Sequence, residues 1–358
     1  MSREHRASRL LHLPAVRRGN PLGLRGRRVA ELAAALVAAL IASLLSGCQA
    51  HTGQPPAAAV GRAAPEGQSP QAPSELRLRD GKTGTPLSRE VLTERLRAAR
   101  AVYVGERHNS RSSHQAQLRV LEQVYALDQS VAVGVEMLPR TLQPQLDAYL
   151  ARSVDEAGFL AAVDWQNTWG FDFALYQPLF EFCRSHGLRM YALNAPRDLA
   201  KAVRQRGVPG LTAAERAELP SGYPWPAPED HRRAVQEVFA RHSFGDEDKR
   251  TPAERVAAFE RFYTAQLVWD ESMAQGVAAI LGGPHPPARV VVLAGVGHVG
   301  RFAIPARATR RGVQAGLALA PVTAPMAGQS EEPPSPADEV DVQIVLPAPP
   351  HPPHPPTS

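Results

Sequence analysis

The chain has 358 residues, of which 44% are hydrophobic, so it is long enough to bury a sizeable core in one large domain or two small ones. Its formal net charge is +5, but residues 1–47 hold eight arginines against Glu4 and Glu31, a local charge of +6. Subtracting +6 from +5 leaves about −1 for the remainder. Because the basic charge is confined to this first segment, we exclude nucleic acid as a partner.

The first 47 residues have the pattern of a signal peptide. An arginine-rich part ends at Arg28, an apolar stretch covers Leu32–Leu45, and small residues then lead to Cys48. About 14 apolar residues are short of the roughly 20 needed to span a bilayer. The ending resembles a bacterial lipobox, in which the cysteine becomes the lipidated first residue. Since Gln49 replaces the Asp typical of inner-membrane lipoproteins, the resemblance implies an anchor in the outer membrane, facing the periplasm.

Residues 48–75 are mostly Gln, Pro, Ala and Gly, which predicts a disordered tether. From Leu76 helix-like and strand-like segments alternate. Alternation of this kind predicts an α/β fold, with a parallel sheet flanked by helices, over residues 76–346. The expected helices are Val91–Ala99, His114–Ala126 and Leu175–Ser185, and the expected strands are Ala101–Val104, Val131–Val135, Arg189–Leu193, Val290–Leu293, Gly316–Ala320 and Val340–Leu346.

The pattern changes at residues 207–260, where charged helical sequence is interrupted by several prolines and no strand is expected. We interpret this part as a smaller helical insertion. A long helix follows, in which Phe262, Gln266, Trp269 and Met273 fall on one face. Residues 347–358 form a Pro/His-rich tail.

Two Gly-x-x-His tetrapeptides follow β-branched runs and end at His108 and His298. In open α/β sheets ligands bind beyond the carboxyl ends of the strands, so both histidines are expected at one edge. Glu106 shares a strand face with His108 if the extended geometry continues, and Glu136 ends the next strand. Two imidazoles and two carboxylates are suitable ligands for zinc, manganese or iron.

Other polar residues belong to the same predicted edge. Asn194 and Arg197 follow a third strand, His114 and Gln117 lie in the first turns after His108, and Gln266 needs a partner if it is buried. Structural roles remain open for each of the main residues. His108 can cap a helix, Glu136 can lie at a helix N-terminus, and Arg197 can pair with a surface acid.

Six motifs, taken in order, resemble the ChaN-like haem-binding lipoproteins over about residues 76–346. They are Val104-Gly-Glu-Arg-His108 with His114 and Gln117, Gly134-Val-Glu136, Tyr176-Gln-Pro-Leu179, Ala192-Leu-Asn-Ala-Pro-Arg197, Gln266 to Ala274, and Gly295-Val-Gly-His298. The resemblance implies a parallel sheet with a smaller helical domain, haem binding linked to iron uptake through a haem or iron transport system, and paired haems at a homodimer interface.

The motifs are also similar to the wider group of TIKI proteins, TraB proteins and erythromycin esterases. That likeness implies metal-dependent hydrolysis, with Glu106, His108, Glu136 and His298 as the corresponding positions. We therefore predict a haem-binding lipoprotein that assists haem and iron uptake, and keep a metal-dependent hydrolase as the alternative. Because haem iron takes an axial Tyr, His, Met or Cys in an apolar slot, the candidate haem ligands are Tyr176, Tyr223, His231 and His242.

Overall fold

A computed structural model describes residues 76–243, 250–324 and 339–347 of the chain. The predicted signal peptide, the lipidation site Cys48, the tether and the Pro/His-rich tail beyond residue 347 lie outside the described residues. Within the described part of the chain, no helix has both the length and the apolar character needed to cross a membrane.

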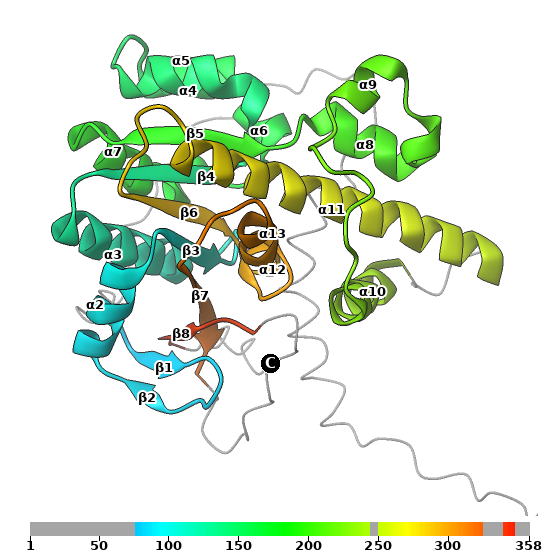
Figure 1. Cartoon of the computed structure of the whole chain (residues 1–358). Helices are drawn as coiled ribbons and strands as arrows, with labels where there is room; N and C mark the ends of the chain where they lie inside the picture. Colours follow the sequence, from blue (N-terminus) through cyan, green and yellow to red (C-terminus); the bar gives the residue numbers. More distant parts are fainter. Residues whose placement is uncertain (1–75, 244–249, 325–338, 348–358) are drawn as a thin grey trace, which may run out of the picture.

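The fold is built on one sheet of eight strands in the order β2-β1-β8-β7-β3-β6-β4-β5. Pairing is antiparallel at β1–β2 and β1–β8, and parallel at every other junction of the sheet. This arrangement confirms the predicted α/β fold (Figure 1). The strands are β1 (Leu78–Asp80), β2 (Pro86–Leu87), β3 (Ala101–Glu106), β4 (Val131–Pro139), β5 (Arg189–Asn194), β6 (Arg289–Gly295), β7 (Gly316–Thr323) and β8 (Val342–Leu346).

Helices cover both faces of the sheet. Side chains alternate along β3, so Val102 and Val104 join one buried cluster and Ala101 and Tyr103 join another. The first cluster packs against helices α2 to α7, and the second packs against α11 and α13. The helices are α2 (Arg89–Ala98), α3 (Arg111–Leu127), α4 (Gln143–Leu150), α5 (Glu156–Ala162), α6 (Trp165–Thr168), α7 (Gln177–Ser185), α8 (Arg197–Arg206), α9 (Ala213–Ala217), α10 (Glu229–Ser243), α11 (Pro252–Leu281), α12 (Val296–Val299) and α13 (Ile304–Arg310).

The smaller helical insertion has a hydrophobic cluster of its own. Val203 of α8, Phe239 of α10 and Phe259 of α11 pack together in it. Helix α11 begins at Pro252 after a capping box, in which the side chain of Thr251 accepts from the backbone of Glu254, so the range 207–260 includes its first turns. Figure 1 shows this half of α11 reaching beyond the sheet beside α10, while its other half lies along β6.

The late strand β6 lies in the middle of the sheet, between β3 and β4. Its register places Gly295 opposite Glu106, and Leu293 opposite Val135. Because the three strands are parallel, their carboxyl ends meet at one edge. The strand order therefore brings together polar residues that are far apart in the sequence.

Candidate functional site: a buried histidine and carboxylate edge

Glu136 and His108 meet over Gly295 at the end of β6. The backbone N–H of Gly295 donates to Glu136 Oε2 at 2.6 Å. A Cβ atom added to Gly295 would lie 2.8 Å from His108 Cε1, closer than real contacts allow. Glycine is therefore required here because a side chain would occupy the space of the His108 ring.

Glu106 and His108 form a pair at the end of β3. His108 Nδ1 lies 2.5 Å from Glu106 Oε1, as expected for side chains two residues apart on an extended segment. On the other side of the carboxylate, His114 Nε2 lies 3.7 Å from Glu106 Oε2. The Tyr176 hydroxyl donates to Glu106 Oε1 at 3.5 Å and to the His108 carbonyl at 3.3 Å. All four side chains are buried.

His298, on the short helix α12, lies between two carboxylates. Its Nδ1 is 2.6 Å from Asp270 Oδ1, and its Nε2 is 3.2 Å from Glu136 Oε1. The Gln266 amide nitrogen lies 3.3 Å from the same Nδ1. Asp270 follows Gln266 by four residues on α11, so both face the histidine from one side of that helix.

Charge pairing dominates the electrostatics of this edge. Burial alone would lower the pKa of His298, but the carboxylates of Glu136 and Asp270 raise it to about 10. Burial likewise opposes the charged form of Glu136, whose pKa is nevertheless lowered to about 2, chiefly by His298. The pKa of His108 is raised, because Glu106 and then Glu136 outweigh its desolvation. At neutral pH His298 is therefore a buried cation paired with buried anions.

Aromatic rings close this edge on the side of α6 and α7. The ring centroids of Trp169 and Phe171 lie 4.7 Å and 4.8 Å from that of His108. The ring of Tyr176 lies 4.3 Å from that of His114. We call the polar residues beneath them the buried edge; they are Glu106, His108, His114, Glu136, Asp270 and His298.

The predicted metal ligands Glu106, His108, Glu136 and His298 are brought together, but as ion pairs. Both nitrogens of His298 already face carboxylates, and His108 Nδ1 faces Glu106. Among the described residues, no three or more His, Cys, Asp or Glu side chains are arranged to hold a metal ion. The geometry thus gives the prediction of zinc, manganese or iron no support.

Three other predicted contacts have defined partners. Asn194 Nδ2 donates to the carbonyl of Glu136 at 3.0 Å, and Gln117 Nε2 donates to the carbonyl of Val104 at 2.9 Å. Both amides therefore hold the strand ends next to the buried edge. Arg197 donates instead to the carbonyl of Asn167 on α6.

The capping alternatives differ from what the structure shows. Ser110, not His108, caps α3, since its side chain accepts from the backbone N–H of Ser113. Glu136 lies within β4 and not at a helix N-terminus. Both residues are accounted for by their contacts in the buried edge.

The candidate haem ligands lie in contrasting surroundings. Tyr176 is completely buried, and burial followed by the charge of Glu106 raises the pKa of its phenol well above the usual value. His231 is also buried: its Nδ1 lies 3.0 Å from the Tyr263 hydroxyl and its Nε2 3.8 Å from Asp270 Oδ2. Desolvation lowers the pKa of His231 to about 4. Tyr223 is 47% exposed. The side chain of His242 lies outside the described residues.

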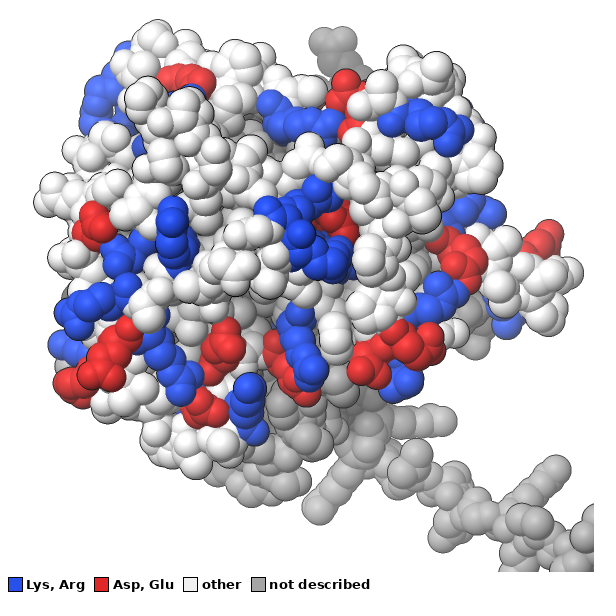
Figure 2. Space-filling model, viewed as in Figure 1, with Lys and Arg blue, Asp and Glu red and all other residues white. Residues whose placement is uncertain are grey.

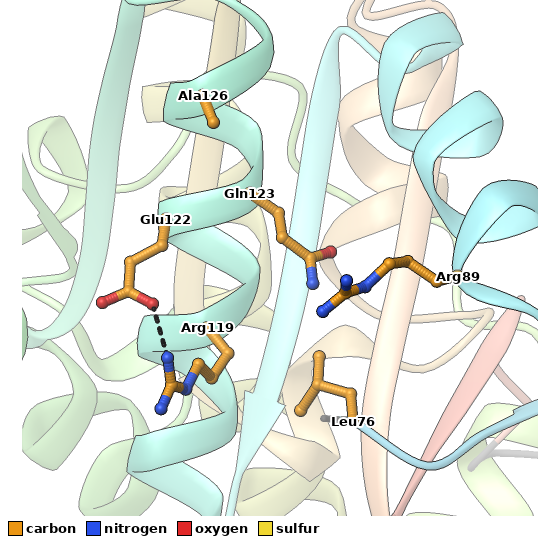
Figure 3. A pocket seen from close by; sticks show the side chains of 6 residues that line it. All are labelled: Leu76, Arg89, Arg119, Glu122, Gln123 and Ala126. Atoms are coloured by element: carbon orange, nitrogen blue, oxygen red, sulfur yellow. Dashed lines mark hydrogen bonds and ion pairs between the residues drawn. The ribbon is translucent and has the colours of Figure 1, made fainter. Parts of the chain in front are cut away.

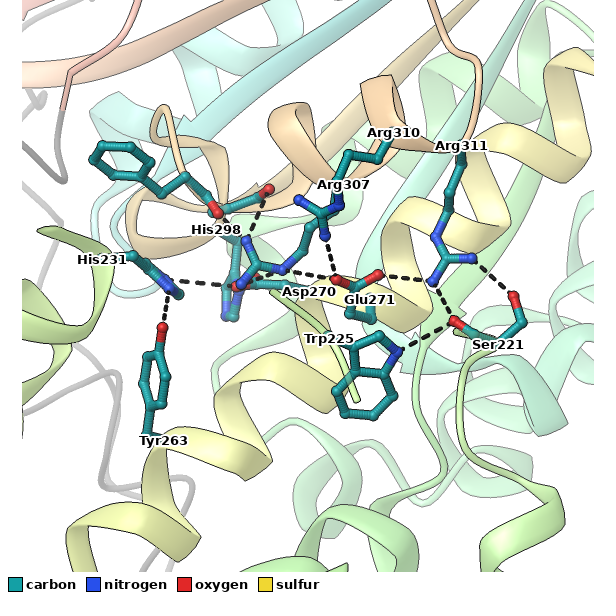
Figure 4. Close-up of polar contacts among 12 residues, drawn as sticks. Ser221, Trp225, His231, Tyr263, Asp270, Glu271, His298, Arg307, Arg310 and Arg311 are labelled. Atoms are coloured by element: carbon teal, nitrogen blue, oxygen red, sulfur yellow. Dashed lines mark hydrogen bonds and ion pairs between the residues drawn. The ribbon is translucent and has the colours of Figure 1, made fainter. Parts of the chain in front are cut away.

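Sequence reasoning missed a second set of charged residues next to the buried edge, drawn in Figure 4. Arg307 of α13 is completely buried, with its Nε 4.0 Å from Asp270 Oδ2 and 3.4 Å from Glu271 Oε1. The spacing of Asp270 from Gln266 was a usable signal, because residues four apart share a helix face. The contacts of Arg307 had no comparable local signal.

A separate pocket of about 210 Å³ lies between α2 and α3 (Figure 3). Arg119 Nη1 lies 3.4 Å from Glu122 Oε2 at its wall. These helices pack on the face of the sheet opposite α11, so the pocket is remote from the helical insertion. Its lining residues are Leu76, Arg89, Arg119, Glu122, Gln123 and Ala126.

The fold and the buried edge define an α/β protein with histidines and carboxylates enclosed at the carboxyl ends of its central strands. Residues 92–308, which are 217 of the 358 residues, match the family described as "Haem-binding uptake, Tiki superfamily, ChaN". The chain belongs to this family, which confirms the resemblance inferred from its motifs.

A solved structure of a ChaN protein supports this fold. The structure titled "Cofacial heme binding to ChaN of Campylobacter jejuni" matches with a TM-score of 0.57 at 16% identity, covering 76% of this chain and 96% of that one. A mutant of the erythromycin esterase EreC in its open conformation matches at a TM-score of 0.41 and 14% identity, covering 75% of this chain and 82% of that one. At these identities the likeness concerns the fold alone.

One curated relative is also similar in sequence. Protein RETICULATA-RELATED 5, chloroplastic, from Arabidopsis thaliana is 27% identical over 135 residues. The match covers 34% of this chain and 17% of that protein, so the chain spans less than a fifth of its length.

Proposed function

We propose that this protein binds haem through Tyr223 and, as an outer-membrane lipoprotein, assists haem and iron uptake. The observation that carries the proposal is the exposure of the Tyr223 side chain in a member of a haem-binding family. An axial phenolate is an established ligand of ferric haem, and the phenol must reach solvent to meet an incoming ring.

The surroundings of Tyr223 suit a flat apolar ligand. Its ring meets that of Trp225 edge to face, with centroids 5.1 Å apart; Pro224 separates the two aromatics in the sequence, and Pro226 follows Trp225. Trp225 is itself anchored, because its Nε1 donates to the carbonyl of Ser221 at 3.2 Å and its ring belongs to the cluster of the insertion. We call Tyr223 and Trp225 together the haem wall, which would therefore be a fixed part of the insertion.

The other two ligand candidates suit haem less well. Tyr176 would have to leave Glu106 and lose a proton where the phenolate is strongly disfavoured. His231 is neutral at physiological pH, as ligation requires, but its ring is enclosed between Tyr263 and Asp270. Haem binding at either position would require the core to open.

Haemin titration of the purified protein tests this proposal. Wild type is expected to give a saturable Soret shift, and Tyr223→Phe to lose or alter it because the axial oxygen is gone. Tyr176→Phe and His231→Ala are the matched controls and should retain the wild-type spectrum. An unchanged spectrum in Tyr223→Phe would contradict the assignment. Loss of the Soret shift in Tyr176→Phe alone would contradict it as well.

A dimer that pairs two haems fits an exposed axial ligand. One tyrosine covers one face of the ring, which leaves the other face free to stack on a second haem. The related Campylobacter structure is titled as cofacial haem binding, and we extend that arrangement to this chain. Sedimentation of the protein with and without haemin should then show a haemin-dependent dimer, and a monomer at saturation would exclude it.

The lipoprotein part of the proposal rests on Cys48. The cysteine follows an apolar stretch and small residues, and about 27 residues separate it from the described domain. Cys48→Ala should therefore move the protein from the detergent phase to the aqueous phase in Triton X-114 partitioning. Cys183→Ala is the matched control, since that thiol is buried in the core and should not affect partitioning. If Cys48→Ala partitions like the wild type, the lipoprotein part of the proposal is wrong.

We do not propose hydrolysis at the buried edge. The corresponding positions Glu106, His108, Glu136 and His298 are all at most 5% exposed and are paired with one another or with Asp270. The described residues contain no group of three or more His, Cys, Asp or Glu side chains arranged to hold a metal there.

A further inference from the structure

Three arginines surround one buried carboxylate near the loop that carries Tyr223. Glu271 accepts from Arg310 Nη2 at 2.6 Å through Oε1 and from Arg311 Nη2 at 2.7 Å through Oε2, and Arg307 Nε lies 3.4 Å from Oε1. Figure 4 shows the three guanidinium groups arriving from α13 and the residue after it. We call these residues the arginine cluster.

The arginine cluster carries an excess of positive charge. Glu271 contributes one negative charge, and Asp270, which lies 4.0 Å from Arg307, is also paired with the charged His298. Among the described residues, Arg307 Nη2 and Arg311 Nε are buried and have no hydrogen-bond partner. His298 is also paired with Glu136, so three arginines and His298 face three carboxylates, which leaves an excess of one positive charge and would favour an anion at the surface of the cluster.

Arg310 is the member of the cluster that is open to solvent. Its side chain is 37% exposed, and within the described part of the chain its guanidinium is engaged through Nη2 alone, by Glu271. Figure 2 shows basic side chains gathered near the middle of the face that Figure 1 assigns to α13. The remaining N–H groups of this guanidinium are available to a ligand.

The arginine cluster is tied directly to the haem-binding loop. Arg311 donates to Ser221 twice, from Nη1 to Oγ and from Nη2 to the carbonyl, each at 2.9 Å. The same carbonyl accepts from Trp225 Nε1, and the Ser221 N–H donates to Gln275 Oε1 at 2.8 Å. Tyr223 lies between Ser221 and Trp225 in the sequence, so the excess charge flanks the proposed haem wall.

We propose that Arg310 binds the propionate carboxylates of haem, with Arg311 fixing the loop beside it. This inference rests on haem binding at Tyr223. Haem carries two carboxylates on one edge of an otherwise apolar ring, so a site that holds the haem iron through the Tyr223 oxygen would gain from a cation that meets this edge. Guanidinium groups bind carboxylates by short, charge-assisted hydrogen bonds.

A comparison of haemin with haemin dimethyl ester, which lacks the propionate charges, distinguishes the propionate contact from binding of the ring. Arg310→Gln should weaken haemin binding by about tenfold or more, the usual effect of losing one charge-assisted bond. It should leave the affinity for the ester unchanged, and Arg310→Lys should restore part of the loss. Arg119→Gln is the matched control, because Arg119 is an exposed arginine with one acidic partner on the opposite face of the sheet.

The outcomes distinguish the two proposals. If wild type binds haemin saturably and Arg310→Gln binds it equally well, the propionate contact is wrong and the haem site stands. If Arg310→Gln loses haemin and ester alike, the arginine acts on the structure of the loop, which also overturns the contact. If wild type shows no saturable binding of haemin, both proposals fail.

Discussion

The buried edge and the loop at residues 219–226 both hold groups able to bind iron, in opposite surroundings. In the buried edge, three histidines lie among carboxylates and aromatic rings, and each has its partners within the domain. In the loop, Tyr223 is exposed beside a fixed tryptophan and an excess of arginine charge. The first region is organised for cohesion between strands, and the second is organised for an external ligand.

The comparison shows that a side chain of a type that binds iron is not always accessible to a ligand. Histidine is the residue type that binds metals most often, but carboxylates occupy both nitrogen atoms of His298 and the Nδ1 atom of His108, and they stabilise the charged forms. Tyr223, by contrast, is about half exposed among the described residues. Substitutions in the buried edge should therefore change stability, whereas substitutions in the loop should change ligand binding.

The largest effect is expected for His298→Ala. It would leave Asp270 and Glu136 as buried carboxylates without their shared cation, and breaking a buried pair costs about 3–5 kcal/mol of unfolding free energy. Urea unfolding should show that loss, with exposed His285→Ala as the control. A loss below about 1 kcal/mol in His298→Ala would mean that the buried edge does not hold the sheet together.

The pH dependence of stability should follow the same pair. Because the pKa of His298 is raised to about 10 in the folded state, its stabilising effect is complete below the ordinary pKa of about 6.5 and is lost as the pH rises from there to 10. Unfolding free energy should fall by up to about 1.4 kcal/mol per pH unit over this range. In His298→Gln the alkaline decline should flatten, and an equal decline in both proteins would contradict the assignment.

At acid pH two other groups reduce stability. The pKa of Glu136 is lowered to about 2, so its contribution is lost as the pH falls from 4.5 to 2. His231, with a pKa lowered to about 4, favours the unfolded chain between pH 6.5 and 4 because the unfolded imidazole binds a proton first. Urea unfolding between pH 3 and 9 should therefore give maximal stability near pH 6.5, and a maximum below pH 5 would contradict these directions.

A smaller effect is expected for Gly295→Ala, which would place a methyl group against the His108 ring. Overpacking of this kind costs about 1–3 kcal/mol. The cost should shrink in a His108→Ala background, because the added methyl group then meets no ring. Urea unfolding of both single variants and the double variant measures this coupling, and strictly additive losses would show that the two residues do not touch.

The smallest effect on stability is expected for Tyr223→Phe, which should change the unfolding free energy by no more than about 0.5 kcal/mol. The phenol is exposed, and the described contacts of its ring involve Trp225, which Phe retains. Unfolding measured without haemin should match wild type, in contrast to His298→Ala. A large loss of stability would place Tyr223 in the core of the insertion and remove the contrast between the two regions.

Much of the buried edge could be predicted from sequence because its rules are local. The Val-rich runs before Glu106 and Gly295 are typical of buried parallel strands, and strands of that type bring their carboxyl ends to one edge. The two-residue spacing of Glu106 and His108 places them on one face, as the structure shows. The metal predicted among these residues stays a prediction, since strand spacing does not tell whether the carboxylates pair with the imidazoles or hold a metal with them.

The exposure of the candidate haem ligands and the contacts of the arginine cluster could not be predicted from local sequence patterns. Tyr176 and Tyr223 both precede a proline within two residues, yet Tyr176 is buried against rings from α3 and α6, whereas Tyr223 is about half exposed and its described ring contact is Trp225 of the same loop. Likewise, Glu271 meets Arg310 and Arg311 only after the chain has passed through β6 and returned along α13. Such contacts depend on tertiary packing, which sequence periodicity does not encode.

The position of β6 also determines when the domain can finish folding. Strands β3 and β4 do not pair with each other in the sheet, and the strand between them ends about 190 residues after β3. A chain that emerges N-terminus first from a ribosome or a translocon therefore presents two Val-rich strand edges with no native partner until residue 295 has followed. Truncation before residue 289 should therefore yield an aggregating fragment and not a smaller folded unit.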